Sequence, residues 1–76
     1  MFEKRKLKKE IENSKKRIDM LEQKRSRSQA ALVDAILRHT EPNDEDVDYF
    51  NQFTAQIDEE RANMHKLMKE LEALEK

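Results

Sequence analysis

The segment His39-Thr40-Glu41-Pro42-Asn43-Asp44 decides the fold, because it is where a helical sequence pattern is interrupted. It holds the only proline of the 76 residues, and proline disfavours the α conformation in the residue before it. Asn43 can cap a new helix through its side-chain oxygen, and the acidic residues that follow suit the positive end of a helix dipole. The sequence therefore predicts a helix over about residues 3–39, a loop over about 40–43 and a helix over about 44–75.

The amino-acid composition favours long helices and argues against several kinds of functional site. The sequence has no glycine, so neither predicted helix is weakened internally by one, and the loops that cradle phosphate groups are excluded. Cysteine is also absent, which excludes disulfides and thiolate metal sites. A chain of this length forms one small domain and encloses a substrate pocket with difficulty. We therefore expect no enzyme activity and no cofactor.

Apolar residues recur at heptad spacing in both predicted helices, where positions a and d of a seven-residue repeat face a partner helix. In the second helix, these positions hold Phe50, Phe53, Ile57, Met64, Leu67, Leu71 and Leu74, with Glu60 as the exception. In the first helix, they hold Leu7, Ile11, Ile18, Leu21, Leu32 and Ala35, with Ser14, Arg25 and Ser28 as exceptions. A short loop makes the two helices antiparallel. The predicted fold is all-α, an antiparallel two-helix coiled-coil hairpin.

Two charged exceptions in the heptad pattern suggest how the helices align. The alignment that a four-residue loop predicts places Arg25 opposite Glu60. A lone charge between two helices is costly, whereas a paired one is tolerated and can fix their register. We therefore predict a register-setting ion pair between Arg25 and Glu60.

The loop-proximal half of the chain is more apolar than a single helix pair requires. Between residues 30 and 37, apolar side chains cover most of the helix circumference, which is typical of a helix with more than one neighbour. We expect a second molecule to pack there, giving a homodimer with a four-helix bundle, and a helix of another protein is the alternative occupant. The expected interface residues are Val33, Ile36, Leu37, Val47, Tyr49 and Phe50.

The charge is divided between the two halves of the sequence. Residues 1–40 carry twelve basic and six acidic side chains, and residues 41–76 carry four basic and eleven acidic ones. The simplest interpretation is that the two helices attract each other and so favour antiparallel pairing. The alternative is that the basic helix binds nucleic acid phosphates. The candidate contacts are Lys4, Arg5, Lys8, Lys9, Lys15 and Lys16.

Three further patterns lack the residues that their chemistry needs. Asp44, Asp46 and Asp48 resemble the start of a calcium-binding EF-hand loop, but the positions that require glycine and glutamate hold Tyr49 and Ala55. The two histidines, at positions 39 and 65, lack a neighbouring ligand at metal spacing, so we expect no metal site. No apolar run is long enough to span a membrane, and no apolar segment follows the basic N-terminal residues, so we expect neither a membrane span nor a secretory signal.

These observations lead to one functional expectation and one alternative. We expect a cytoplasmic, non-enzymatic protein that acts as a protein-interaction or self-assembly module without membrane contact. The alternative is a nucleic-acid-associated accessory or regulatory protein that uses its basic N-terminal helix.

Overall fold

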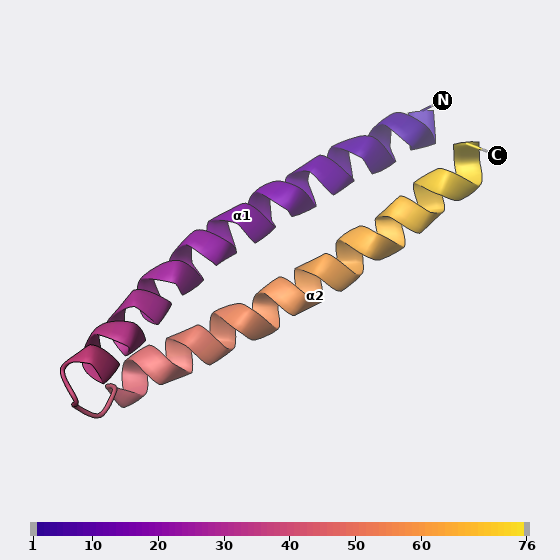
Figure 1. Cartoon of the computed structure of the whole chain (residues 1–76). Helices are drawn as coiled ribbons and strands as arrows, with labels where there is room; N and C mark the ends of the chain where they lie inside the picture. The colour runs from indigo at the N-terminus through magenta and orange to yellow at the C-terminus, as the bar shows by residue number, and fades with distance from the viewer. Residues whose placement is uncertain (1, 76) are drawn as a thin grey trace.

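The computed structural model describes residues 2–75, which form two α-helices joined by a short connection. Helix α1 comprises Phe2–Leu37, helix α2 comprises Asp44–Glu75, and residues 38–43 connect them. The helices fold back on each other as an elongated hairpin of 56 × 16 × 14 Å (Figure 1). The predicted all-α helical hairpin is confirmed.

Helix α1 ends at Leu37, two residues before the predicted end, because the chain turns sharply at His39. His39 has a backbone φ of 57°, in the left-handed region that glycine usually occupies. The His39 amide donates to the carbonyl of Ile36 at 3.1 Å, and the Thr40 amide donates to the carbonyl of Ala35 at 3.0 Å. These two bonds form a Schellman motif, which satisfies carbonyls at the end of the helix. The chain terminates α1 by this motif without using a glycine.

Helix α2 begins where the sequence predicts, and Asn43 caps it. The Oδ1 atom of Asn43 accepts a hydrogen bond from the Glu45 amide at 3.2 Å. The carbonyl of Asn43 accepts from the amides of Asp46 and Val47. The cap satisfies amides that have no partner within the helix, and three acidic residues follow in the first turn.

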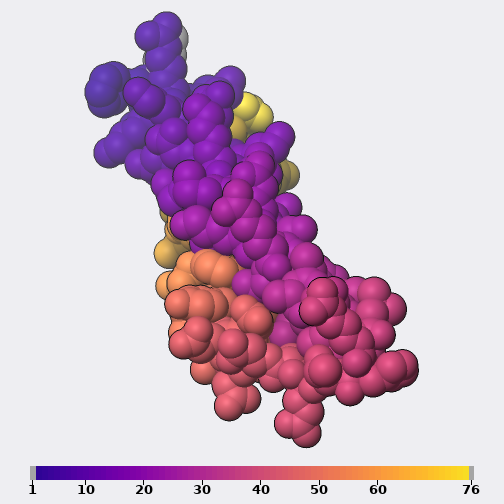
Figure 2. All heavy atoms as spheres, turned by 90° about the vertical axis from the view of Figure 1, so that its left-hand side faces the viewer, coloured from indigo at the N-terminus to yellow at the C-terminus, as the bar shows by residue number. Residues whose placement is uncertain are grey.

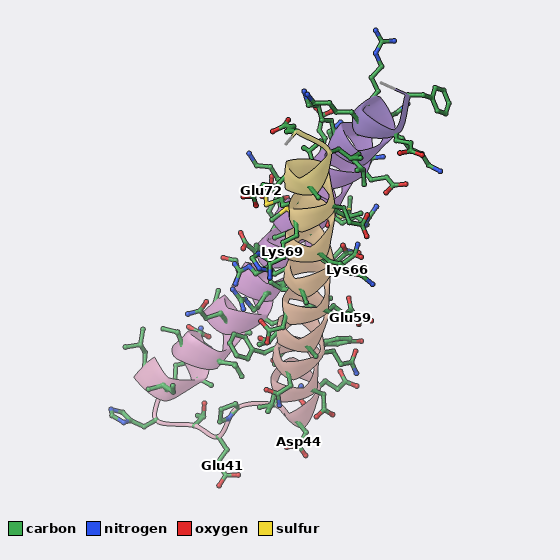
Figure 3. All side chains as sticks on the ribbon, turned by 90° about the vertical axis from the view of Figure 1, so that its right-hand side faces the viewer. Glu41, Asp44, Glu59, Lys66, Lys69 and Glu72 are labelled. Carbon is green, nitrogen blue, oxygen red and sulfur yellow. The ribbon has the colours of Figure 1, made fainter. Side chains whose placement is uncertain are left out.

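The predicted heptad positions identify the surface along which the helices pack. Ser14 and Ile57 are fully buried and Ile18 is 6% exposed. The other residues at positions a and d, from Leu7 to Leu71, are partly buried, whereas Leu74 is 48% exposed. Charged side chains cover the outward side of α2, where Figure 3 labels Glu59, Lys66, Lys69 and Glu72. The core of the hairpin is therefore a single narrow seam with three buried residues.

Candidate functional site

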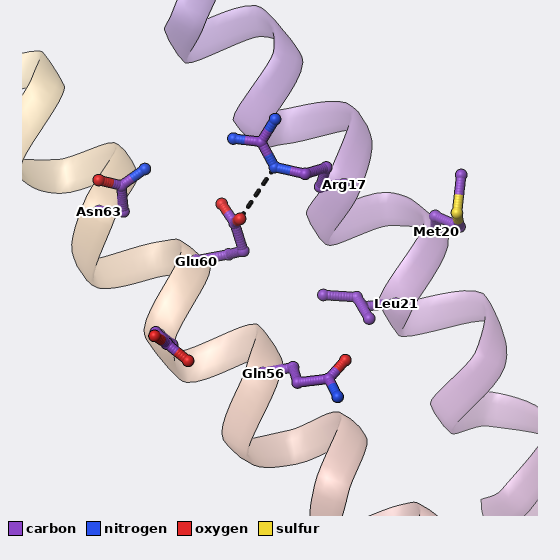
Figure 4. Close-up of a pocket in the computed structure, with 7 residues that line it drawn as sticks. Arg17, Met20, Leu21, Gln56, Glu60 and Asn63 are labelled. Atoms are coloured by element: carbon purple, nitrogen blue, oxygen red, sulfur yellow. Dashed lines mark hydrogen bonds and ion pairs between the residues drawn. The ribbon is translucent and has the colours of Figure 1, made fainter.

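A polar cluster joins the two helices near the middle of the hairpin. The Glu60 carboxylate accepts a hydrogen bond from Arg17 Nε at 2.8 Å and another from Ser14 Oγ at 2.9 Å. Figure 4 shows the Arg17 side chain reaching across from α1 to Glu60 on α2. Ser14 is fully buried, and its hydrogen bond to a carboxylate satisfies the hydroxyl inside the seam.

The predicted ion pair between Arg25 and Glu60 is wrong, because Glu60 pairs with Arg17, which lies eight residues earlier in α1. Arg25 is partly buried at the heptad position where the sequence places it, but its predicted partner is engaged elsewhere. The physical reason is that shifting one helix by about a heptad brings the same classes of residue face to face. The heptad pattern therefore identifies the facing residues without fixing which of them are opposite each other.

The surroundings of Glu60 lower the pKa of its carboxyl below the usual value of 4.5. The hydrogen bond from Arg17 contributes most, because it stabilises the charged form. Burial opposes this effect by raising the pKa, while the hydrogen bond from Ser14 and the charge of Arg17 lower it further. The carboxylate is therefore held in its ionised form between the helices.

An open groove runs beside this cluster. Besides Arg17 and Glu60, the groove is lined by Met20, Leu21, Gln56, Glu59 and Asn63 (Figure 4). The one ionised pair in the groove is engaged in joining the helices. Over residues 2–75, no group of three or more histidine or acidic side chains is placed to hold a metal ion. The arrangement aligns the two helices.

The second candidate site is an apolar surface at the loop end of the hairpin. We call Val33, Ile36, Leu37, Val47 and Tyr49 the loop-end surface. These side chains are between 36% and 73% exposed, with Leu37 the most exposed. Phe50, the sixth predicted interface residue, is partly buried in the seam. Figure 2 shows the last turns of α1 and the first turns of α2 together at this end.

Aromatic packing and heptad position define the two sides of the loop-end surface. The ring of Tyr49 stacks on Phe53, with centroids 6.2 Å apart, and is half exposed. Ile36 and Val47 occupy heptad position e, which they share with Glu22 and Arg61. Glu22 and Arg61 form an ion pair across one flank of the seam. Residues at position e of antiparallel helices lie on the same flank. Ile36 and Val47 therefore lie on the flank marked by this ion pair, and Tyr49, at position g, lies on the other.

The basic residues predicted as nucleic acid contacts lie along the first half of α1. Lys4 is partly buried and pairs with Glu75 at 3.6 Å. The other five, Arg5, Lys8, Lys9, Lys15 and Lys16, are exposed. Within the described part of the chain, these five have no ion-pair partner. They form a positively charged stretch that lies outside the four ion pairs of residues 2–75.

Within residues 2–75, neither helix has the length and apolar character that crossing a membrane requires. Comparisons of the chain with protein families, with curated proteins and with solved structures found no match. The functional argument therefore depends on the surfaces of the hairpin itself.

Sequence reasoning missed the roles of Ser14 and Arg17 in the polar cluster. Ser14 interrupts the apolar heptad pattern at position d, and Arg17 lies next to the seam at position g. A buried hydroxyl needs a hydrogen-bond partner, so the serine at a seam position was a signal that a polar group faces it. Over residues 50–74, Glu60 is the one charged residue at a seam position of α2, and the structure places its carboxylate within hydrogen-bonding distance of Ser14.

Proposed function

We propose that this protein is a non-enzymatic interaction module that self-associates through its loop-end surface. The observation that supports the proposal is the exposure of five large apolar side chains at one end of a hairpin whose seam buries only three residues. Large apolar side chains gathered at an exposed end of a small protein are typical of an interaction site. In this role the two helices serve to present the surface to a partner.

The energetics of a two-helix fold support the same proposal. A single seam seldom offsets the conformational entropy lost when this many residues become ordered. Covering the loop-end surface removes further apolar area from water, worth roughly 25 cal/mol for each Å². A homodimer with a four-helix bundle is the simplest assembly that gives each helix a second neighbour.

Sedimentation equilibrium across a concentration series tests self-association. We expect the wild-type chain to form a dimer, and we expect Ile36→Ser and Val47→Ser to weaken it at least tenfold. Serine and these aliphatic residues have similar helix propensities, so the helices should be retained. Met20→Ser is the matched control, because Met20 is 57% exposed but lies away from the loop end. A wild-type chain that remains monomeric throughout the series would disprove the proposal.

A second candidate function is binding of nucleic acid, favoured by the five exposed basic residues of α1 that have no ion-pair partner within residues 2–75. Lysine and arginine contacts to phosphates release counterions, so this binding should weaken steeply as salt is added. Fluorescence anisotropy with labelled duplex DNA and RNA at two salt concentrations measures it. Replacing Lys8, Lys9 and Lys15 with alanine should abolish binding, whereas replacing Lys66 and Lys69 of α2 should not. No binding at low salt would exclude this candidate.

A further inference from the structure

We propose that two copies of the chain lie side by side with their loops at the same end, with α1 of each copy against α2 of the other. This inference rests on the proposed self-association and adds the relative orientation of the two copies and the helices that adjoin. Two separate observations support it. The first is the position of the apolar side chains along the hairpin, and the second is the division of charge between the helices.

The position of the apolar side chains favours loops at the same end. On the flank marked by the Glu22–Arg61 ion pair, Ile36 and Val47 lie at the loop end. Towards the open end, the same heptad position holds three exposed charged residues, Lys8, Lys15 and Glu75, and one exposed apolar residue, Met68. With the loops at opposite ends, the apolar residues of one copy would face these charges, which lose hydration without gaining a partner. With the loops at the same end, apolar residues face apolar residues.

Side-by-side packing is favoured over contact between the tips of the loops. The connection and the first five residues of α2 carry five acidic side chains, namely those of Glu41, Asp44, Glu45, Asp46 and Asp48. Tip-to-tip contact would place ten carboxylates together, and like charges repel each other. It would also bury little area, whereas a stable interface buries about 800 Å² on each partner. Packing along the flank covers Ile36 and Val47 and leaves the loop carboxylates in water.

The division of charge determines which helices adjoin. Helix α1 carries eleven basic and six acidic residues, and α2 carries three basic and ten acidic ones. Within each hairpin, the net positive α1 attracts the net negative α2. Placing α1 of one copy against α2 of the other creates the same attraction across the interface. Placing α1 against α1 would instead bring two net positive helices together. The charges therefore favour a bundle in which every helix adjoins helices of opposite net charge.

Intermolecular distances between spin labels test this orientation. Because the sequence has no cysteine, Glu41→Cys in the connection and Glu72→Cys near the open end each provide one labelling site. Both positions are exposed, so nitroxide labels should not perturb the seam. Pulsed electron resonance on each labelled variant then reports the separation of equivalent sites in the two copies. We expect both separations to be much shorter than the 56 Å length of the hairpin.

Other combinations of the two separations would contradict the proposed orientation in different ways. Two separations comparable to the length of the hairpin would show loops at opposite ends and overturn the orientation, while the proposed self-association would stand. A short separation at residue 41 with a long one at residue 72 would show tip-to-tip contact and also overturn it. Absence of any intermolecular signal, together with a monomeric mass, would overturn both the orientation and the proposed function.

Salt dependence of the dimer tests the placement of the helices. If α1 adjoins α2 of the partner, added sodium chloride screens an attraction and raises the dissociation constant of the dimer. If α1 adjoined α1, screening would remove a repulsion and lower the dissociation constant. Sedimentation at two salt concentrations distinguishes these cases, and tighter association at high salt would contradict the proposed placement.

Discussion

At the scale of single residues, a buried serine and a carboxylate on the facing helix join the two helices at mid-length. Ser14 is fully buried, and its hydroxyl has a hydrogen-bond partner there because it donates to the Glu60 carboxylate. Arg17 supplies the positive charge that compensates the carboxylate, and it remains half exposed to solvent. A short side chain at a seam position also leaves room for the longer glutamate from α2. The three residues form one unit, since removing any of them leaves a polar group in the seam with fewer partners.

The lowered pKa of Glu60 predicts how this unit responds to acid. A carboxyl whose pKa is lower in the folded state contributes stability that is fully present above its unfolded pKa and is lost as the pH falls through the folded pKa. The stability difference between the wild-type chain and Glu60→Gln should thus be largest near neutral pH. It should decrease as the pH is lowered from about 6 to about 3.

Urea unfolding followed by circular dichroism at a series of pH values measures this difference. The control is Glu59→Gln, which removes a carboxylate from the same turn without touching Ser14 or Arg17. A difference between the wild-type chain and Glu60→Gln that is constant over this pH range would contradict the assignment.

At the scale of secondary-structure elements, the end of α1 contains the one non-glycine residue with a positive φ within residues 2–75. His39 adopts the left-handed conformation that a Schellman motif requires, although its side chain makes this conformation costly. Glycine adopts it without a steric penalty. The hydrogen bonds of Thr40 compensate in part, because both its amide and its hydroxyl donate to the carbonyl of Ala35.

Replacing His39 with glycine should therefore stabilise the hairpin. We expect a gain in the free energy of unfolding of roughly 0.5–1 kcal/mol, because the relief of backbone strain exceeds the added entropy of the unfolded chain. Thermal and urea unfolding of His39→Gly measure the gain. Glu41→Gly is the matched control, since His39 is the one residue with a positive φ within residues 2–75. Equal effects of the two substitutions would show that the conformation of His39 is not costly.

The elements also show what the sequence can and cannot predict. Pro42 and Asn43 identify the connection and the start of α2 through simple backbone and capping chemistry. The periodicity of apolar residues identifies the packed face of each helix. It does not determine the register, because Glu60 finds polar neighbours both in the predicted alignment, at Arg25, and in the observed one, at Ser14 and Arg17. The end of α1 was missed by two residues because histidine gives no sequence signal for the left-handed conformation that glycine usually marks.

At the scale of the whole molecule, the hairpin is a thin rod with little interior. Two apolar residues, Ile18 and Ile57, are buried, and the remaining apolar side chains of the seam are partly exposed. Four ion pairs lie within residues 2–75, and most of their side chains are too exposed to contribute more than about 1 kcal/mol each. If a second copy covers the loop-end surface, as we propose, that contact should add to the stability of the rod.

Stability that depends on association should depend on protein concentration. If the loop-end surface is covered in a dimer, mass action favours the folded dimer, so the Tm should rise as the chain is made more concentrated. Differential scanning calorimetry over a hundredfold range of concentration measures this shift. Ile36→Ser should have a lower Tm that changes less with concentration. A Tm independent of concentration for the wild-type chain would contradict a role for association in stability.

Because the Ser14–Arg17–Glu60 unit lies at mid-length, the alignment of the two helices does not depend on the turn that connects them. Alignment is held by side chains far from residues 38–43, so the connection acts mainly as a tether. Lengthening a flexible tether is inexpensive, roughly 0.6 kcal/mol for each doubling. An insertion between Glu41 and Pro42 would leave intact the motif that ends α1 and the cap that begins α2. The connection is thus a natural graft position, where a foreign peptide can be displayed at the tip of a rod without altering how the rod is built.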